Sequence, residues 1–527
     1  MIKLDIILPI KYSAEAIKDA VLSRIPISRE ELTDYRLIRR TLDLSDTTAP
    51  KYKCTVALDF SPDREAGLLK MRKTVKPYDE EIYAAEQVSL GMRPVVVGAG
   101  PAGLFAALAL AEAGTRPIIL ERGMAVEERK ETVKRFNLFG TLDEECNVQF
   151  GEGGAGAFSD GKLKFGSIDK YKLRVIRELI LSGATEDVAY SATAHLGTDR
   201  LPGIVRSLRE KIISLGGEFI FSAKFCEVKL SSGELSAIVY EKGGEVCEIP
   251  TRAAILAIGH SARDTIRYLY KTGVPMVQRG FGIGMRVEHP REYINSIIYK
   301  DALDIIKETA SYHLVTHLSS GRSVYSFCMC PGGTVVAATS DRDAIVTNGM
   351  SEYSRMADNS NSAILVSVTP EDFGSESALA GIEYQERIER SAYALSNSYR
   401  APSIRLFDLI EGRGAVTLDG VKPSYSIGTV AAHPDEYMPS FISESMKAGF
   451  LDFDAWLSGF ALGDATLTGP ETRTTSPIRI LRTESGEAEG FPGIYPAGEG
   501  AGYAGGIVSS AVDGLREAEL LLKKRGK

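Results

Sequence analysis

The sequence predicts an α/β protein in which a parallel sheet and a β-meander form the central domain, with a small α/β domain before it and an α+β domain inserted into it. Three observations lead to this fold class. An apolar run at residues 94–97 is followed at once by a glycine-rich turn and an Ala/Leu-rich helix that ends near Ala113. A second apolar run follows at residues 117–120. A meander of short strands at residues 218–250 then leads into a buried strand at residues 253–259.

The first unit, residues 93–122, carries the spacing Gly-x-Gly-x-x-Gly directly between strand and helix. Gly98 permits the tight turn, Gly100 lets backbone amides approach a pyrophosphate, and Gly103 lets the helix pack closely on the strand. Phosphates are expected at the positive end of the helix. Glu121, at the end of the second strand, can accept hydrogen bonds from ribose hydroxyls. The unit therefore predicts a Rossmann-like dinucleotide site; the alternative is a purely structural glycine turn.

The same spacing recurs at residues 151–156 and 500–505, but neither copy has a strand before it and an acid-ended strand after it. The many glycines of residues 147–164 nevertheless allow backbone N–H groups to approach a ligand closely. This segment is predicted to form a second wall of the dinucleotide site; the alternative is an ordinary flexible loop.

Near the C-terminus, a short strand at residues 494–496 is followed by Gly498 and Glu499, and a helix is expected to start near Gly505, Gly506 and Ile507. A carboxylate at a strand end and a helix N-terminus are both suited to a bound cofactor.

Composition limits the classes of function. The 527 residues suggest about three domains. With 62 basic and 70 acidic residues, a net charge of -8 and no strongly basic stretch, no nucleic-acid partner is expected. Six cysteines without framework spacing favour reduced thiols and a cytoplasmic location. The uncharged residues 95–111 are explained by the nucleotide motif, so no membrane span is expected, and residues 1–10 do not form a signal peptide.

The pattern divides the chain into three predicted domains. The N-terminal module should hold strands at residues 2–9, 35–44 and 52–60 and one helix at residues 13–23. A charged, helix-prone connector follows at residues 63–86. The predicted boundaries are 1–88 for the N-terminal module, 89–265 with 478–527 for the dinucleotide domain, and 266–477 for a substrate or cap domain.

The predicted substrate domain contains the turn sequence Pro-Gly-Gly at residues 331–333, which predicts a hairpin between residues 323–330 and 334–339. Cys328 and Cys330 would then face the same side. Two cysteines supply only two metal ligands, and His313 and His317 lie in a strand-like stretch without a nearby carboxylate at metal-site spacing. No metal site is predicted.

The chain resembles FAD-dependent oxidoreductases of the glutathione reductase and succinate dehydrogenase superfamily, and more closely a largely uncharacterised family of bacterial FAD-dependent dehydrogenases. Besides residues 98–121, the motifs that carry the likeness are GEGGAGAFSDGKL, YSFCMCPGG, ETRTTSPIRI and PAGEGAGYAGGIVSSAVDG. The likeness spans nearly the whole chain. With the segments above, it implies FAD contacts at Gly98, Gly100, Pro101, Ala102, Gly103, Glu121, Arg122, Gly153, Gly154, Ser159, Phe225, Gly259, Gly498, Glu499, Gly505, Gly506 and Ile507.

The expected function is hydride transfer between flavin N5 and an unidentified small-molecule substrate, with NAD(P)H as a candidate transient reductant. Candidate catalytic residues are Arg473, Cys330 and His260. Arg473 could instead form a structural ion pair, Cys330 could be a packing residue, and His260 could lie at the surface. Alternatives for the whole protein are electron transfer to a quinone or a redox partner protein, an RNA-modifying flavoprotein, and a non-catalytic flavin sensor. The absence of Cys-x-x-Cys spacing and of a second nucleotide unit separates the chain from disulfide reductases.

Overall fold

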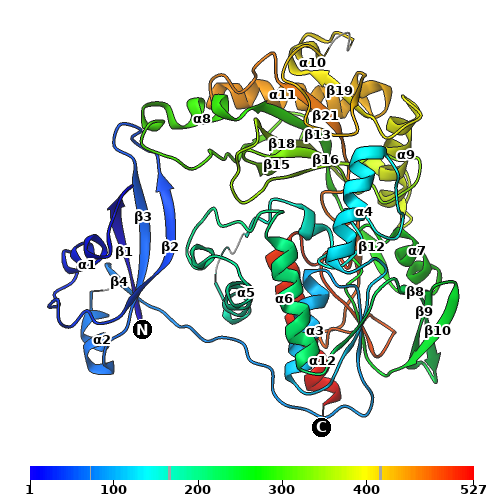
Figure 1. The fold of residues 1–527 in the computed structure, drawn as a ribbon, viewed down its shortest axis with the longest axis horizontal. Coiled ribbons are helices and arrows are strands. Elements are labelled where there is room, and N and C mark those ends of the chain that lie inside the picture. The colour runs from blue at the N-terminus through cyan, green and yellow to red at the C-terminus, as the bar shows by residue number, and fades with distance from the viewer. Residues whose placement is uncertain (72, 164–165, 167, 415–417, 527) are drawn as a thin grey trace.

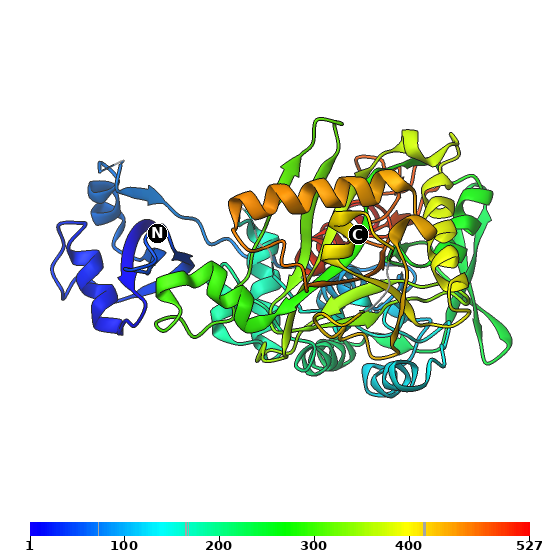
Figure 2. The same ribbon diagram turned by 90° about the horizontal axis from the view of Figure 1, so that it is seen from above.

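The computed structural model describes residues 1–71, 73–163, 166, 168–414 and 418–526 (Figure 1). The N-terminal module stands at one side of a larger body, and a long connecting segment runs from it to the parallel sheet (Figures 1 and 2). The predicted fold class, an α/β protein with a parallel sheet and a β-meander, is confirmed.

The N-terminal module is a four-stranded sheet in the order β2-β3-β1-β4. Its first strand alternates buried and exposed residues, so that Ile2, Leu4, Ile6 and Leu8 form one apolar face. The strands and first helix agree with prediction within two residues. The elements are β1 (Ile2–Pro9), α1 (Ala14–Leu22), β2 (Tyr35–Asp43), β3 (Lys51–Leu58), α2 (Pro62–Leu68) and β4 (Val75–Pro77).

The predicted helical character of residues 63–86 was wrong beyond Leu68. Residues 75–77 instead pair with the free edge of β1, and the chain then continues without helix or strand to residue 94. Tyr83 is buried in the core of the larger body, where its ring lies 5.3 Å from that of Tyr171. Strand pairing and this anchor outweigh the local helix propensity of the connector.

Five parallel strands in the order β23-β11-β5-β6-β7 form the central sheet. Helices α3, α6 and α12 lie beside one another against it, and the antiparallel meander β8–β10 lies on its other side (Figure 1). Because α3 is covered on all sides, it is apolar all round. The elements are β5 (Val95–Val97), α3 (Pro101–Glu112), β6 (Ile118–Leu120), α6 (Leu201–Ser214), β7 (Glu218–Ile220), β8 (Lys224–Ser231), β9 (Glu234–Lys242), β10 (Glu245–Pro250), β11 (Ala254–Leu256), β23 (Ile494–Pro496) and α12 (Ile507–Arg525).

Several smaller elements frame this sheet and connect it to the rest of the chain. They are α4 (Val126–Phe139), η1 (Ala155–Phe158), α5 (Lys170–Leu181), η2 (Glu186–Ala189), α7 (Arg263–Lys271), β12 (Met276–Gln278) and β22 (Ile478–Ile480).

The middle block contains a seven-stranded sheet in the order β14-β15-β18-β13-β21-β19-β20, and α11 crosses one side of it (Figure 2). Its division from the central sheet at residues 266 and 477 remains a prediction. The elements are β13 (Phe281–Pro290), α8 (Arg291–Tyr299), η3 (Lys300–Ala302), β14 (Val315–His317), β15 (Ser323–Cys330), β16 (Thr334–Ala337), β17 (Thr347–Met350), β18 (Asn359–Val368), η4 (Pro370–Phe373), α9 (Ala380–Ala394), β19 (Ala401–Arg405), α10 (Leu406–Glu411), β20 (Thr429–Ala431), η5 (Pro434–Glu436), α11 (Ser440–Trp456) and β21 (Thr466–Glu471).

The predicted hairpin between residues 323–330 and 334–339 is absent from this sheet. β15 pairs with β14 and β18, whereas β16 pairs with β17 in a separate two-stranded sheet. The glycines of the turn explain the difference. A Cβ on Gly332 would lie 1.7 Å from the Arg355 carbonyl oxygen, and one on Gly333 would lie 2.3 Å from that of Met350. The turn is packed against distant backbone, which directs the chain away from β15.

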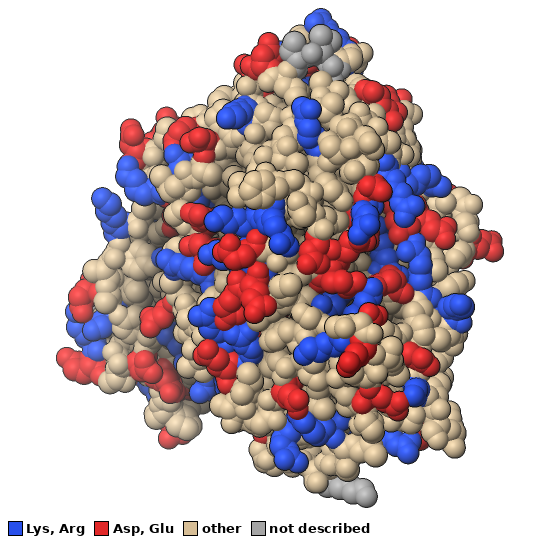
Figure 3. Space-filling model, turned by 45° about the vertical axis from the view of Figure 1, so that its right-hand side comes forward, with Lys and Arg blue, Asp and Glu red and all other residues tan. Residues whose placement is uncertain are grey.

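The surface shows no separation of charge on the face in Figure 3, where basic and acidic side chains are intermingled. Among the helices that the structure describes, none combines the length and the apolar character needed to cross a membrane.

The contact between α3 and α12 depends on Gly514, where a Cβ would lie 2.0 Å from the Ala102 carbonyl oxygen. We expect Gly514→Ala to force the helices apart and to lower the free energy of unfolding by about 1–3 kcal/mol, measured by chemical denaturation. Gly203→Ala is the control, because a Cβ on Gly203 in α6 meets no described atom within 4 Å. It should be neutral or stabilise by up to about 1 kcal/mol; equal losses in both variants would contradict this account.

Candidate functional site

A cavity of about 1840 Å³, including its open mouth, lies at the carboxyl ends of the parallel strands. Crevices at this edge of an open α/β sheet are where such folds bind ligands. Helices α3 and α12 both begin at the cavity, so their first backbone N–H groups, which have no partner within the helix, are directed toward it. The far end of the cavity is formed by β15, β17 and residues at the end of β21.

The glycine turn after β5 is shaped by close backbone contacts. Gly98 has φ of 101°, and a Cβ there would lie 2.3 Å from the Ala257 carbonyl oxygen. Gly98 and Gly100 line the cavity together with Pro101 and Ala102. Gly103 lies behind them, where a Cβ would be 1.8 Å from the Gly98 carbonyl oxygen, so this position packs the helix on the strand.

Glu121 and Arg122 follow β6 at the cavity wall. The buried Glu121 carboxylate accepts backbone N–H groups from Ala99 at 2.8 Å, Gly123 at 2.9 Å and Gly151 at 3.0 Å. Only one of these reaches Oε2, so this oxygen keeps acceptor capacity for a ligand hydroxyl. Arg122 is committed to Glu145 and Asp264, and its guanidinium lies 4.0 Å from the centre of the Phe150 ring.

The glycine-rich segment after α4 is a buried, hydrogen-bonded wall rather than a flexible loop. Arg129 of α4 is fully buried and its guanidinium donates to five backbone carbonyls, those of Asn147, Val148, Gly151, Glu152 and Gly154, at 2.6–3.1 Å. Burial lowers the pKa of Arg129 to about 10. Arg129 therefore fixes the path of this segment.

Two residues of this wall, Gly154 and Ser159, line the cavity as the sequence predicts for contact residues. Gly153 does not line it; its N–H donates to the Ala99 carbonyl at 2.8 Å and ties the wall to the first glycine turn. Residue 164, the end of the predicted segment, lies outside the described residues.

Two further turns complete the nucleotide half of the cavity. Gly259, Glu499, Gly505, Gly506 and Ile507 line it. Gly498 is behind the wall and donates its N–H to Asp513 at 2.7 Å. Phe225 of β8 lines the cavity from the meander side.

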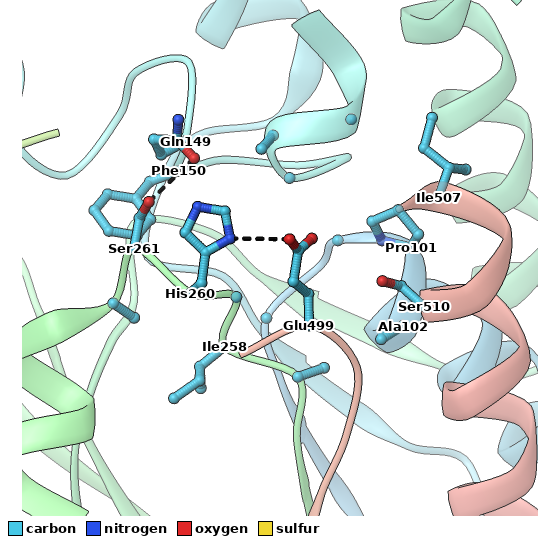
Figure 4. A pocket seen from close by; sticks show the side chains of 18 of the residues that line it. Pro101, Ala102, Gln149, Phe150, Ile258, His260, Ser261, Glu499, Ile507 and Ser510 are labelled. Carbon is cyan, nitrogen blue, oxygen red and sulfur yellow. Dashed lines mark hydrogen bonds and ion pairs between the residues drawn. The ribbon is translucent and has the colours of Figure 1, made fainter. Parts of the chain in front are cut away.

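His260 faces Glu499 across the cavity floor (Figure 4). Its Nδ1 lies 3.3 Å from Glu499 Oε1, while its Nε2 is buried and has no hydrogen-bond partner among the described residues. A buried ring nitrogen without a partner is costly, which indicates that a ligand atom bonds to it. The position agrees with the cofactor-side interpretation of His260 rather than with a surface role.

Arg473 lines the cavity but is engaged in ion pairs that join the central sheet to the middle block. It pairs with Glu389 at 2.9 Å and with Asp341, and it donates to Ser261 after β11 at 3.2 Å. Arg263 of α7 binds the same Glu389 carboxylate through two hydrogen bonds of 2.7 and 2.8 Å. Burial opposes ionisation, but the two arginines hold the pKa of Glu389 well below its usual range. The geometry favours the structural interpretation of Arg473, with Glu389 and Asp341 as its partners.

At the far end, Cys328 lines the cavity, whereas the catalytic candidate Cys330 is fully buried behind it. The neighbouring Cys330 side chain is the largest influence on Cys328; with the charges of Arg286 and Lys162 it lowers the pKa of Cys328 in spite of burial. The proximity of Cys328, together with burial, raises the pKa of Cys330 well above its usual value. Within the described part of the chain, no three His, Cys, Asp or Glu side chains converge as a metal site requires.

Sequence reasoning missed three residues that line this end: Lys162, Asn348 and Glu471. Lys162 is part of the glycine-rich motif, so a search of that motif for charged residues would have found it. Glu471 is part of the motif ETRTTSPIRI and pairs with Arg286 at 2.5 Å. Asn348 lies in β17 outside every motif, and only the tertiary structure brings it to the cavity.

Comparison with known proteins agrees with this geometry. Residues 93–132 match the family model described as "FAD binding domain", and residues 280–474 match "FAD-dependent protein, C-terminal domain-like". An uncharacterized protein of Clostridium beijerinckii is 42% identical over 512 residues, which cover 96% of this chain and 95% of the relative.

Similar solved structures include a mutant of the E. coli quinol fumarate reductase FrdA and the L-proline dehydrogenase from P. horikoshii. The first is 12% identical with a TM-score of 0.38 and covers 84% of this chain and 71% of that chain. The second is 11% identical with a TM-score of 0.34 and covers 84% of this chain and 95% of that chain. The family assignment rests on the sequence matches.

The five carbonyl contacts of Arg129 make it the most sensitive position of the glycine-rich wall. Arg129→Met should lower the free energy of unfolding by about 3 kcal/mol or more, because it leaves buried carbonyls without donors. Arg135→Met, on the exposed side of the same helix, is the matched control and should change it by less than about 0.5 kcal/mol. Denaturant titration of both variants measures the difference; an unaffected Arg129→Met protein would show that the wall does not need this residue.

Proposed function

The chain belongs to a largely uncharacterised family of bacterial FAD-dependent oxidoreductases, and from that premise we propose that it transfers a hydride between flavin N5 and a small-molecule substrate. The observation that carries the proposal is the continuity of the cavity. One cavity joins the nucleotide turns of the central sheet to ionisable side chains of the middle block.

The residues present fit FAD. At Gly259, Gly505 and Gly506 a Cβ would meet no described atom within 4 Å, so the backbone there is open to a ligand; two helix N-termini are directed at the cavity, and Glu121 Oε2 retains acceptor capacity. The partnerless Nε2 of His260 is the clearest sign that a ligand completes this wall. The residues proposed to hold FAD by lining its cavity are Gly98, Gly100, Pro101, Ala102, Glu121, Arg122, Gly154, Ser159, Phe225, Gly259, Glu499, Gly505, Gly506 and Ile507.

FAD supplies a two-electron centre that accepts or gives hydride at N5. The chain's own residues bind and orient: Glu121 is suited to the adenosine ribose, Glu499 to the ribityl hydroxyls, and the N-terminus of α12 to negative charge on the ring. Substrate would enter against the end formed by Cys328, Asn348 and Lys162. The sequence holds one complete nucleotide unit, so NAD(P)H as reductant would bind transiently in this same cavity.

The first test is cofactor binding and reduction. The purified protein, or its apo form titrated with FAD, should show the bound-flavin absorption spectrum with one FAD per chain. Anaerobic mixing with NADH and, separately, NADPH then measures whether a nicotinamide bleaches the oxidised flavin. Bleaching by either supports transient reduction by NAD(P)H, and its absence would leave the substrate as the reductant. A folded protein that neither carries nor binds FAD would contradict the proposed function.

Gly505 allows the cavity to be filled without disturbing the protein, because a Cβ there meets no described atom within 4 Å. Gly505→Leu should place a side chain where the flavin is expected and weaken FAD binding by about 10-fold or more, which is about 1.4 kcal/mol. Fluorescence titration with FAD measures this. Gly505→Ala is the control, with at most a small loss, and the unfolding midpoint of both apoproteins should equal that of the wild type. Unchanged affinity in Gly505→Leu would show that FAD does not occupy this part of the cavity.

A further inference from the structure

The far end of the cavity holds ionisable groups that the proposed cofactor contacts do not use. Cys328, Lys162, Asn348 and Glu471 line it; we call this set the thiol end. Cys328 has φ of 43°, at a bulge that interrupts the pairing of β15 with β18 between Phe327 and Cys330. Non-glycine residues in this conformation cluster at functional sites, and here the bulge directs one cysteine to the cavity while the other stays behind it.

Arg286 organises the thiol end from beneath. Its guanidinium donates to Glu471 at 2.5 and 3.0 Å, to the Cys328 carbonyl at 3.0 Å, to Asn348 Oδ1 at 3.0 Å and to Asn361 at 2.8 Å. These contacts use all five N–H donors of an arginine. Arg286 therefore positions the other groups and acts on Cys328 through its charge, but it has no donor left for a ligand.

The charges at the thiol end do not balance if Cys328 is neutral. The cations are Lys162, Arg286 and Arg355, and the carboxylates are Asp160 and Glu471. Asp160 is bonded to Arg355 at 2.7 Å, and Glu471 to Arg286. The Glu471 carboxylate accepts two hydrogen bonds from Arg286, so its charge at most balances that of Arg286. One positive charge remains, that of Lys162.

The Lys162 ammonium needs an anion close by. Its Nζ lies 3.9 Å from Asp160 Oδ2, beyond hydrogen-bonding distance, and it has no hydrogen-bond partner in the described parts of the chain. Burial lowers the pKa of Lys162 and the charge of Asp160 opposes this, while the side chain stays 24% exposed at the cavity that it lines. Of the remaining groups at the thiol end, only Cys328 can ionise to provide a negative charge next to the cavity.

We propose that Cys328 is a thiolate paired with the Lys162 ammonium, and that it is the proton-transfer group of the reaction; the second part rests on the proposed function. In the oxidising direction, the sulfur takes the proton from a substrate O–H, N–H or C–H, so that an S–H bond forms as that bond breaks. The hydride of the adjacent substrate C–H leaves with its electron pair to oxidised FAD, and a double bond forms in the substrate. In the reducing direction, the thiol returns the proton.

Two neighbours prepare the site for this role. Asn348 Oδ1 accepts from Arg286 and from the Gly349 N–H at 2.8 Å, so the amide N–H₂ of this cavity-lining residue has no partner among the described residues and is available as a donor for a substrate oxygen. Cys330 donates its S–H to the Cys328 carbonyl at 3.2 Å. The charged and titratable groups around Cys328, from every packed element, are Asp160, Lys162, Arg286, Cys330, Arg355 and Glu471.

The pH dependence of alkylation tests the thiolate directly and needs neither substrate nor cofactor. The apoprotein is treated with iodoacetamide, and modification of each cysteine is followed by peptide mass spectrometry, with Cys247 of the exposed meander as internal reference. The rate at Cys328 should change by less than about threefold from about pH 6 to about pH 9, whereas an ordinary thiol gains more than about 100-fold over this range. An ordinary profile at Cys328 would overturn the proposal.

Lys162→Met and Lys162→Arg separate charge from packing. Removing the charge in Lys162→Met should move the midpoint of Cys328 alkylation up by about one pH unit or more, and Lys162→Arg should keep it near the wild-type value. Equal unfolding midpoints of the three proteins establish that the fold is intact. A midpoint that is the same in Lys162→Met as in the wild type would overturn the pairing of Cys328 with Lys162.

The FAD-loaded protein tests the second part. A thiolate beside oxidised flavin gives a broad long-wavelength charge-transfer band, which should titrate with the alkylation midpoint and be missing in Cys328→Ser. A protein that binds FAD but shows no such band would overturn proton transfer by Cys328. Failure to bind FAD would overturn the proposed function instead, and the alkylation result would still decide whether Cys328 is a thiolate.

Discussion

Close approach of backbone to backbone at the carboxyl ends of the parallel strands is the constraint on which the rest of this structure depends. A Cβ would be 2.3 Å from another backbone atom at Gly98 and 2.5 Å at Gly500. Each contact joins segments that are far apart in the chain, and together they bring the turns after β5, β11 and β23 to one cavity. Glycine is required there because the space that a side chain would fill is taken by the neighbouring turn. The cavity stays open because these turns pack against one another and do not fill the space between them.

Buried charge holds the walls in place around this constraint. Arg129 supports the glycine-rich wall by hydrogen bonds to carbonyls, and Glu389 binds both Arg263 and Arg473 where the central sheet meets the middle block. Desolvated arginines are stabilising only when every donor is used in good geometry. Such groups fix one arrangement of the two parts, so the far end of the cavity keeps a defined position relative to the nucleotide turns.

Buried charge also organises the thiol end of the cavity. Arg286 uses all its donors to position Glu471, Asn348, Asn361 and the Cys328 carbonyl, while the Lys162 ammonium donates to no atom in the described part of the chain. Arg286 therefore has a structural role, whereas the Lys162 ammonium can interact with a group in the cavity. The part of the cavity at the central sheet is built mainly from backbone amides and helix ends, whereas the thiol end is built from side chains.

The sequence by itself determined the parallel sheet, the meander and the first glycine turn, because these depend on local periodicity and on glycines at fixed spacing. Of the 17 contact residues predicted for the cofactor, 14 line the cavity. The sequence could not decide the pairing of β15, the extended connector after Leu68, or the roles of Arg473 and Cys330. Those depend on partners that are distant in the chain: Arg473 pairs with Glu389, 84 residues away, β15 pairs with β18, and residues 75–77 of the connector pair with β1. Asn348 of β17 and Lys162 of the glycine-rich segment line one cavity only because the tertiary structure brings these segments together, and no local pattern along the chain encodes that arrangement.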